Sequence, residues 1–84
     1  MAEIVIYSTS SCIHCERAKN FFETNNLKDK EIRVDLDPEK LSEMLTLSNG
    51  YRTVPQIFIN KTHIGGNDKL MELHSSGELE KLLN

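Results

Sequence analysis

Two cysteines separated by two residues, Cys12 and Cys15, constrain this chain more than any other feature of its sequence. The run at 4–7 before them is apolar and β-branched and predicts a buried strand. Ala18 and Phe22 after them have helical spacing. Both sulfurs are therefore expected at a strand-to-helix junction, where a helix start favours the reactive thiolate. A disulfide closing so short a loop constrains the unfolded chain little, so the spacing indicates redox chemistry rather than a structural staple.

Composition excludes several classes of protein. The net charge of −3 and the pI near 5.5 give no general attraction to nucleic acid or to anionic lipid. No apolar run approaches the ~20 residues that a membrane span needs, and the Met1-Ala2-Glu3 start lacks the positive residues of a signal peptide. We therefore expect one cytoplasmic domain over residues 1–84, monomeric and without nucleic-acid or membrane partners.

Hydrophobic patterns divide the chain into alternating elements without a linker. Strands are predicted at 3–8, 31–36, 56–59 and 62–64, and helices at 12–25, from Pro38 to about 48, from Asn67 or Asp68 onward, and around Leu79, Leu82 and Leu83. The expected helix caps are Ser10 or Ser11, Asp37, and Asn67 or Asp68. The order β-α-β-α-β-β-α-α predicts an α/β fold, with a parallel strand pair in the first half and a hairpin in the second.

The two thiols are expected to share one helix face, because positions three apart lie side by side. Cys12, at the exposed end, is predicted to attack first, and Cys15, one turn inside, to act second through a mixed disulfide. The alternative is half of a zinc site. Tetrahedral zinc needs four ligands, and only His14, His63 and His74 remain to add nitrogen. We favour redox chemistry, with no metal.

Two further stretches are candidates for ligand binding. In Thr53-Val54-Pro55, the proline precedes a strand and lacks an N–H, and an X–Pro bond at such a place can be cis. In Gly65-Gly66-Asn67-Asp68, the glycines permit close backbone approach, and the N–H groups of the following helix can bind an anion. Each stretch by itself is also compatible with an ordinary strand start or a tight turn.

The histidines and basic residues receive plainer interpretations. His14 is either a cation beside Cys12 or a solvent-facing side chain, and we favour the second because adjacent helix positions point apart. His63 and His74 are predicted at the surface, and Lys19 and Arg33 are interpreted as solvated charges.

Cys12-Ile13-His14-Cys15, the run at 53–59 and the run at 63–68 together resemble the glutaredoxin family, in the family's order and over essentially the whole chain. The resemblance implies the thioredoxin fold, a four-stranded mixed β-sheet flanked by helices, with Pro55 cis and near the cysteines. It also implies reduction of glutathione mixed disulfides and of protein disulfides, with glutathione as co-substrate.

By position, the resemblance makes Cys12 the nucleophile and Cys15 the resolving thiol. The backbone of Val54 would pair with the cysteinyl part of glutathione, with Thr53 beside it. The other expected glutathione contacts are Pro55, Gly66 and His14 along the groove, Asn67 and Asp68 at the γ-glutamyl group, and Gln56 or Arg52 at the glycine carboxylate.

Four positions differ from the usual family pattern. Ile13 and His14 replace Pro and Tyr, Thr9 stands where many members have Lys, and Lys69 stands where many have an acid. Ile13 motivates an alternative function, a [2Fe–2S] cluster held between two subunits by Cys12 and glutathione. Thioredoxin-type reduction by a flavoprotein reductase is a third hypothesis, less favoured because the chain is short and no Trp precedes the cysteines.

Overall fold

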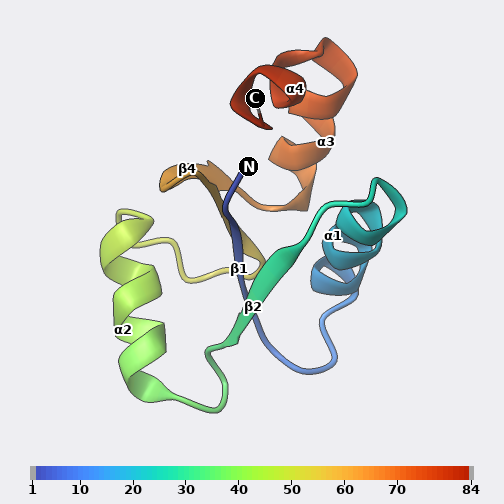
Figure 1. The fold of residues 1–84 in the computed structure, drawn as a ribbon. Helices are drawn as coiled ribbons and strands as arrows, with labels where there is room; N and C mark the ends of the chain where they lie inside the picture. The colour runs from blue at the N-terminus through green and yellow to red at the C-terminus, as the bar shows by residue number, and fades with distance from the viewer. Residues whose placement is uncertain (1, 84) are drawn as a thin grey trace.

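The centre of the molecule is a four-stranded sheet with strand order β2-β1-β3-β4, seen in a computed structural model that describes residues 2–83 (Figure 1). The elements are β1 (Ile4–Ser8), α1 (Ile13–Thr24), β2 (Asp29–Arg33), α2 (Pro38–Leu47), β3 (Gln56–Ile59), β4 (Thr62–Gly65), α3 (Asn67–Ser76) and α4 (Glu78–Leu83). Their order is the predicted one. Met1 and Asn84, which the predicted domain includes, lie outside the described residues. Within residues 2–83, no helix combines the length and the apolar character needed to cross a membrane.

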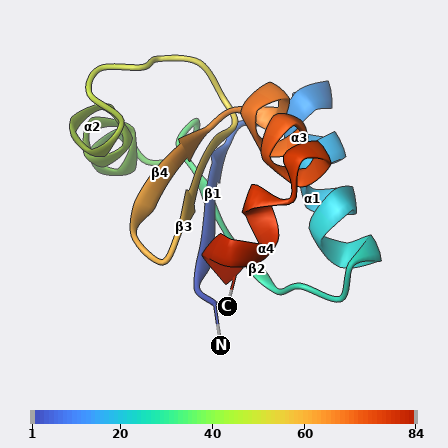
Figure 2. The same cartoon turned by 90° about the horizontal axis from the view of Figure 1, so that it is seen from above.

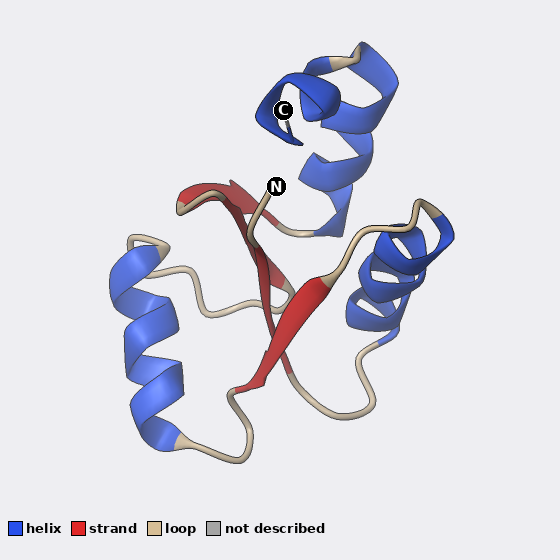
Figure 3. Cartoon of the chain, viewed as in Figure 1, coloured by secondary structure: helices blue, strands red, loops and turns tan. Residues whose placement is uncertain are grey.

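The sheet is mixed, as predicted. β1 runs parallel to β2 and antiparallel to β3, and β3 pairs with β4 as an antiparallel hairpin. Figures 1 and 3 show α2 on one side of the sheet and α1 and α3 on the other, and the view from above in Figure 2 shows the same arrangement. The chain therefore buries both faces of its sheet under helices.

Each face has its own apolar cluster, because successive strand residues point to opposite sides. The larger cluster, under α1, α3 and α4, consists of Ile4, Ile6, Ala18, Phe22, Ile57, Ile59, Ile64, Leu70 and Leu79. The smaller cluster, under α2, consists of Tyr7, Val34, Met44 and Phe58. The larger cluster fixes α1 against the sheet and so positions the two cysteines at its start.

The second strand lies two residues earlier than predicted at its start and three earlier at its end. The alternation predicted a strand over 31–36, whereas β2 spans Asp29–Arg33. β2 is an edge strand that pairs only with β1, and the ladder ends where Ser8 pairs with Arg33. The chain then leaves the sheet, and Leu36 is 72% exposed. Strand length here is set by the partner strand and not by the local pattern.

Two of the three predicted helix caps are wrong. Asp37 caps α2 as expected, with its carboxylate accepting the Glu39 N–H at 3.0 Å. The cap of α1 is Cys12 itself, because its sulfur accepts a backbone N–H as a serine oxygen would. α3 has Gly66 at its cap position and no side-chain cap bond, so Asn67 and Asp68 stand in the first turn and not at the cap.

Candidate active site

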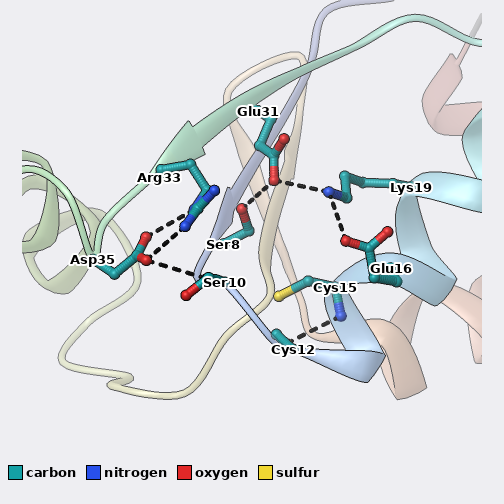
Figure 4. Close-up of polar contacts among 9 residues, drawn as sticks. All are labelled: Ser8, Ser10, Cys12, Cys15, Glu16, Lys19, Glu31, Arg33 and Asp35. Carbon is teal, nitrogen blue, oxygen red and sulfur yellow. Dashed lines mark hydrogen bonds and ion pairs between the residues drawn. The ribbon is translucent and has the colours of Figure 1, made fainter.

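The two cysteines lie at the start of α1, with their sulfurs at different depths. Cys12 is half-buried and Cys15 is 1% exposed. The backbone N–H of Cys15 donates a hydrogen bond to the Cys12 Sγ at 3.2 Å (Figure 4). The structure thus agrees with the predicted division into an outer and an inner thiol, and an N–H donated to sulfur stabilises negative charge on it.

Cys15 is held in its thiol form by its surroundings. Burial raises the pKa of Cys15 to about 12, and the hydrogen bond with Cys12 contributes in the same direction. The Lys19 ammonium and the Thr9 backbone act in the opposite direction, toward the thiolate.

We expect one equivalent of iodoacetamide at pH 8 to modify Cys12 at least about tenfold faster than Cys15, because alkylation requires an accessible thiolate. Peptide mass mapping after partial labelling measures the ratio. In 6 M guanidinium chloride the two rates should converge, which controls for intrinsic sequence effects. Equal rates in the folded protein would contradict the assignment of Cys15 as the buried thiol.

A row of linked polar side chains lies beside Cys15 and was not predicted from the sequence. The Ser8 hydroxyl donates to Glu31 Oε2 at 2.5 Å, and Lys19 lies 3.0 Å from Glu31 and 3.1 Å from Glu16 (Figure 4). These bonds from Ser8 and Lys19 lower the pKa of Glu31. Lys19 is therefore an ion-paired residue and not the solvated charge that was predicted. Lys19 follows Cys15 by four positions, which places both residues on one helix face. This spacing was the sequence signal that Lys19 lies near the inner thiol.

The loop before Cys12 is tied to the sheet edge by Asp35. Its carboxylate accepts the Ser10 N–H at 3.2 Å and pairs with the Arg33 guanidinium at 2.6 Å (Figure 4). The Arg33 guanidinium holds the pKa of Asp35 well below its usual range. Ser11 has a positive φ of 56°, so the chain turns sharply here. This anchored turn presents Cys12 at the helix start.

The Val54–Pro55 peptide bond is cis, as the resemblance implied. The Val54 carbonyl lies beside Cys12, whose thiol donates to that oxygen at an S–O distance of 3.9 Å. Gly66 lies next to the same loop, since a Cβ added there would be in ordinary van der Waals contact with the Pro55 carbonyl oxygen, at 3.5 Å. Two segments far apart in sequence thus meet around the outer thiol.

A groove of about 290 Å³ runs between this loop and the start of α3. It is lined by His14, Thr53, Val54, Pro55, Gly66, Asn67, Asp68 and Lys69. Seven of the eight belong to the predicted binding set, and Lys69 is an addition. The buried Asn67 Oδ1 has no hydrogen-bond partner among residues 2–83. His14 is exposed at the rim, as favoured from the sequence.

A second hollow, of about 400 Å³, shares Thr53, Gly66 and Lys69 with the groove. His63 lines it and is half-buried, so it lies at the surface as predicted but is partly enclosed, and burial lowers its pKa. Gln56 also lines it but is 3% exposed, and its amide is hydrogen-bonded within the protein. Arg52 is exposed and lines neither hollow.

The described part of the chain provides no set of ligands for the alternative zinc site. Across residues 2–83, no group of three or more His, Cys, Asp or Glu side chains lies close enough together to hold a metal ion.

This chain is similar in sequence to known proteins. A family model described as Glutaredoxin matches residues 4–64. A glutaredoxin from Pseudomonas aeruginosa is 42% identical over 84 residues, covering 100% of this chain and 99% of the relative. Glutaredoxin-C8 from Oryza sativa is 41% identical over 86 residues, covering 98% of this chain and 63% of the relative.

The similarity extends to solved structures. The crystal structure of a buckwheat glutaredoxin–glutathione complex superimposes with a TM-score of 0.86 at 33% identity, covering 98% of this chain and 76% of that one. The superposition therefore includes the sheet, the helices and the segments that surround Cys12.

Proposed function

This chain belongs to the glutaredoxin family and has its thioredoxin fold, and on that premise we propose that it is a glutathione-dependent thiol–disulfide oxidoreductase. Its substrates would be glutathione mixed disulfides and disulfide or glutathionylated proteins. The observation that supports this most directly is the position of Cys12 Sγ, which lies between the Cys15 N–H and the Val54 carbonyl beside the groove.

The proposed reaction begins with the Cys12 thiolate. It attacks the glutathionyl sulfur of a mixed disulfide, and the substrate leaves as a thiolate that takes up a proton. A second glutathione thiolate attacks the glutathionyl sulfur on Cys12, which yields glutathione disulfide and restores the Cys12 thiolate. When the substrate is a protein disulfide, Cys12 attacks one of its sulfurs and the other leaves as a thiolate. Cys15 passes its proton to the released protein thiolate and attacks Cys12 Sγ, which frees the reduced protein and forms a Cys12–Cys15 disulfide. Two glutathione molecules then reduce this disulfide and leave as glutathione disulfide.

The groove offers complementary groups to glutathione. An extended Val54 backbone can pair with the cysteinyl residue, and the exposed Asp68 carboxylate in the groove can accept from the γ-glutamyl ammonium. The N–H groups at the start of α3 can receive the neighbouring carboxylate. For the glycine carboxylate we favour Arg52 or Lys69 over Gln56, because the Gln56 amide nitrogen already donates to Thr53. A glutathione-bound relative with the same fold supports the choice of ligand.

The test is turnover of the mixed disulfide of glutathione and 2-mercaptoethanol, coupled to glutathione reductase and NADPH. We expect NADPH oxidation that requires both the protein and glutathione. The same disulfide with thioredoxin reductase and NADPH, without glutathione, tests the thioredoxin-type hypothesis and should give no turnover. Absence of glutathione-dependent turnover would contradict the proposed function.

A [2Fe–2S] cluster carrier is the second candidate, and the exposure of Ile13 favours it. Ile13 is 62% exposed next to Cys12 and provides an apolar surface on which a second subunit could pack. Each chain would supply one accessible thiolate, Cys12, so glutathione would have to supply the remaining sulfur ligands. Anaerobic reconstitution with iron, sulfide and glutathione should then give a brown dimer, and a colourless monomer would reject this role. The cytoplasmic setting and the monomeric resting state stay predictions.

A further inference from the structure

A line of side-chain hydrogen bonds connects the β3–β4 hairpin to the loop beside Cys12. His63 Nε2 lies 2.7 Å from Gln56 Oε1. The Gln56 Nε2 donates to the Thr53 carbonyl at 2.9 Å and to the Thr53 hydroxyl at 3.2 Å. Thr53 directly precedes Val54, whose carbonyl accepts from the Cys12 thiol.

The direction of these bonds is determined by Thr53. A backbone carbonyl can only accept, so the amide nitrogen of Gln56 must face it, and the amide oxygen must face His63. His63 therefore donates from Nε2, so this nitrogen carries a proton. Each group in the line is thus fixed as a donor or an acceptor by the group beside it.

The line is held in place from both sides. The His63 ring packs against Phe58, with centroids 5.0 Å apart, and against Tyr51 at 5.8 Å. Gln56 is buried in β3, so its amide has little freedom to find other partners. Residues 51–55 have no regular helix or strand structure, and hydrogen bonds from side chains take the place of a sheet ladder there.

We propose that His63 is a positioning residue, which acts through Gln56 to fix the Thr53 carbonyl and thereby the Val54 backbone beside Cys12. The inference rests on the proposed function in one respect, that the Val54 backbone receives glutathione. If His63 no longer donates, the buried Gln56 oxygen is left without a partner, and the amide nitrogen is held less firmly against Thr53.

Three substitutions distinguish the effect of the His63 N–H donor from the effect of its aromatic ring. His63→Phe keeps an aromatic ring without a donor, His63→Gln places an amide N–H near the position of Nε2, and His63→Asn is too short to reach Gln56. We expect His63→Phe and His63→Asn to raise KM for the glutathione mixed disulfide by about 5- to 10-fold, as loss of one buried hydrogen bond implies. His63→Gln should stay within about twofold of wild type.

Two controls distinguish positioning from general damage. The protein-dependent rate of cystine reduction by dithiothreitol, above the direct reaction, requires the thiols but not bound glutathione, so it should change by less than about twofold in all three variants. Gln56→Met removes the same line from its middle with an apolar side chain of similar size, and it should reproduce the KM increase even if His63→Phe fails to fold. Equal KM values in wild type and in Gln56→Met, or an equal loss of both activities, would overturn the proposal.

A measurement without substrate keeps the inference separate from the proposed function. In ¹⁵N-labelled protein, the two Gln56 side-chain N–H signals should be resolved and slow to exchange in wild type and His63→Gln. They should move toward free-amide positions in His63→Asn. If this pattern holds but wild type shows no glutathione-dependent turnover, the proposed function fails and the hydrogen-bond line stands. Unchanged Gln56 signals in His63→Asn would refute the line itself.

Discussion

Replacement of Cys12 by serine is expected to lower glutathione-dependent turnover by at least about 1,000-fold, because a serine hydroxyl cannot replace a thiolate in disulfide exchange. The structure explains why Cys15 cannot substitute for it. Cys15 is buried, its pKa is raised to about 12, and the groove opens beside Cys12. The coupled assay with the mixed disulfide of glutathione and 2-mercaptoethanol measures the loss.

Cys15→Ser is the matched variant, since it changes one sulfur to oxygen three residues away. We expect it to keep turnover of the glutathione mixed disulfide within about tenfold of wild type, because that cycle returns through a second glutathione. Turnover of a protein disulfide in the same variant should fall much further, because no internal thiol can release the trapped substrate. Full activity of Cys12→Ser, or equal losses in the two variants, would refute the assignment of attacking and resolving thiols.

Much of the site could be predicted because its reactive and binding residues fall in short local motifs. The Cys12–Cys15 spacing, the proline at 55 and the Gly65-Gly66 pair each have a specific backbone use, and their order along the chain identified one fold. Strands with clear β-branched runs, such as β1 and β3, were found at nearly their true positions. The motif residues then met in space as the family resemblance implied.

Other features depended on contacts between segments distant in sequence. The end of β2 is set by the end of β1, so the alternation through Leu36 predicted too long a strand. Lys19 looked solvated until β2 brought Glu31 beside it. His63 looked exposed because its partner, Gln56, lies across a hairpin turn. The cap of α1 was missed for a different reason: the sulfur of Cys12 serves both as the reactive atom and as the cap acceptor.

Phe22→Ala is expected to destabilise the protein by about 3–5 kcal/mol, the usual cost of removing a buried phenylalanine ring. Phe22 is 0% exposed and packs in the larger cluster between α1 and the sheet. At ~0.05–0.15 kcal/mol per residue, a chain of this length has a total stability of the same order, so the variant should be marginally folded. Urea unfolding followed by circular dichroism measures the free energy of unfolding.

Phe21→Ala is the control, because Phe21 is the adjacent aromatic residue, is only partly buried and packs beside His74 with ring centroids 4.8 Å apart. It should cost clearly less than Phe22→Ala, and equal losses would contradict the assignment of Phe22 as the anchor of α1. Cys15, Ala18 and Phe22 are the buried residues of α1, so loosening the ring should also open the inner thiol. Alkylation of Cys15 in native buffer should therefore accelerate in Phe22→Ala in proportion to the opened population, while Cys12 labelling changes little. This links the packing of the core to the property that separates the two sulfurs.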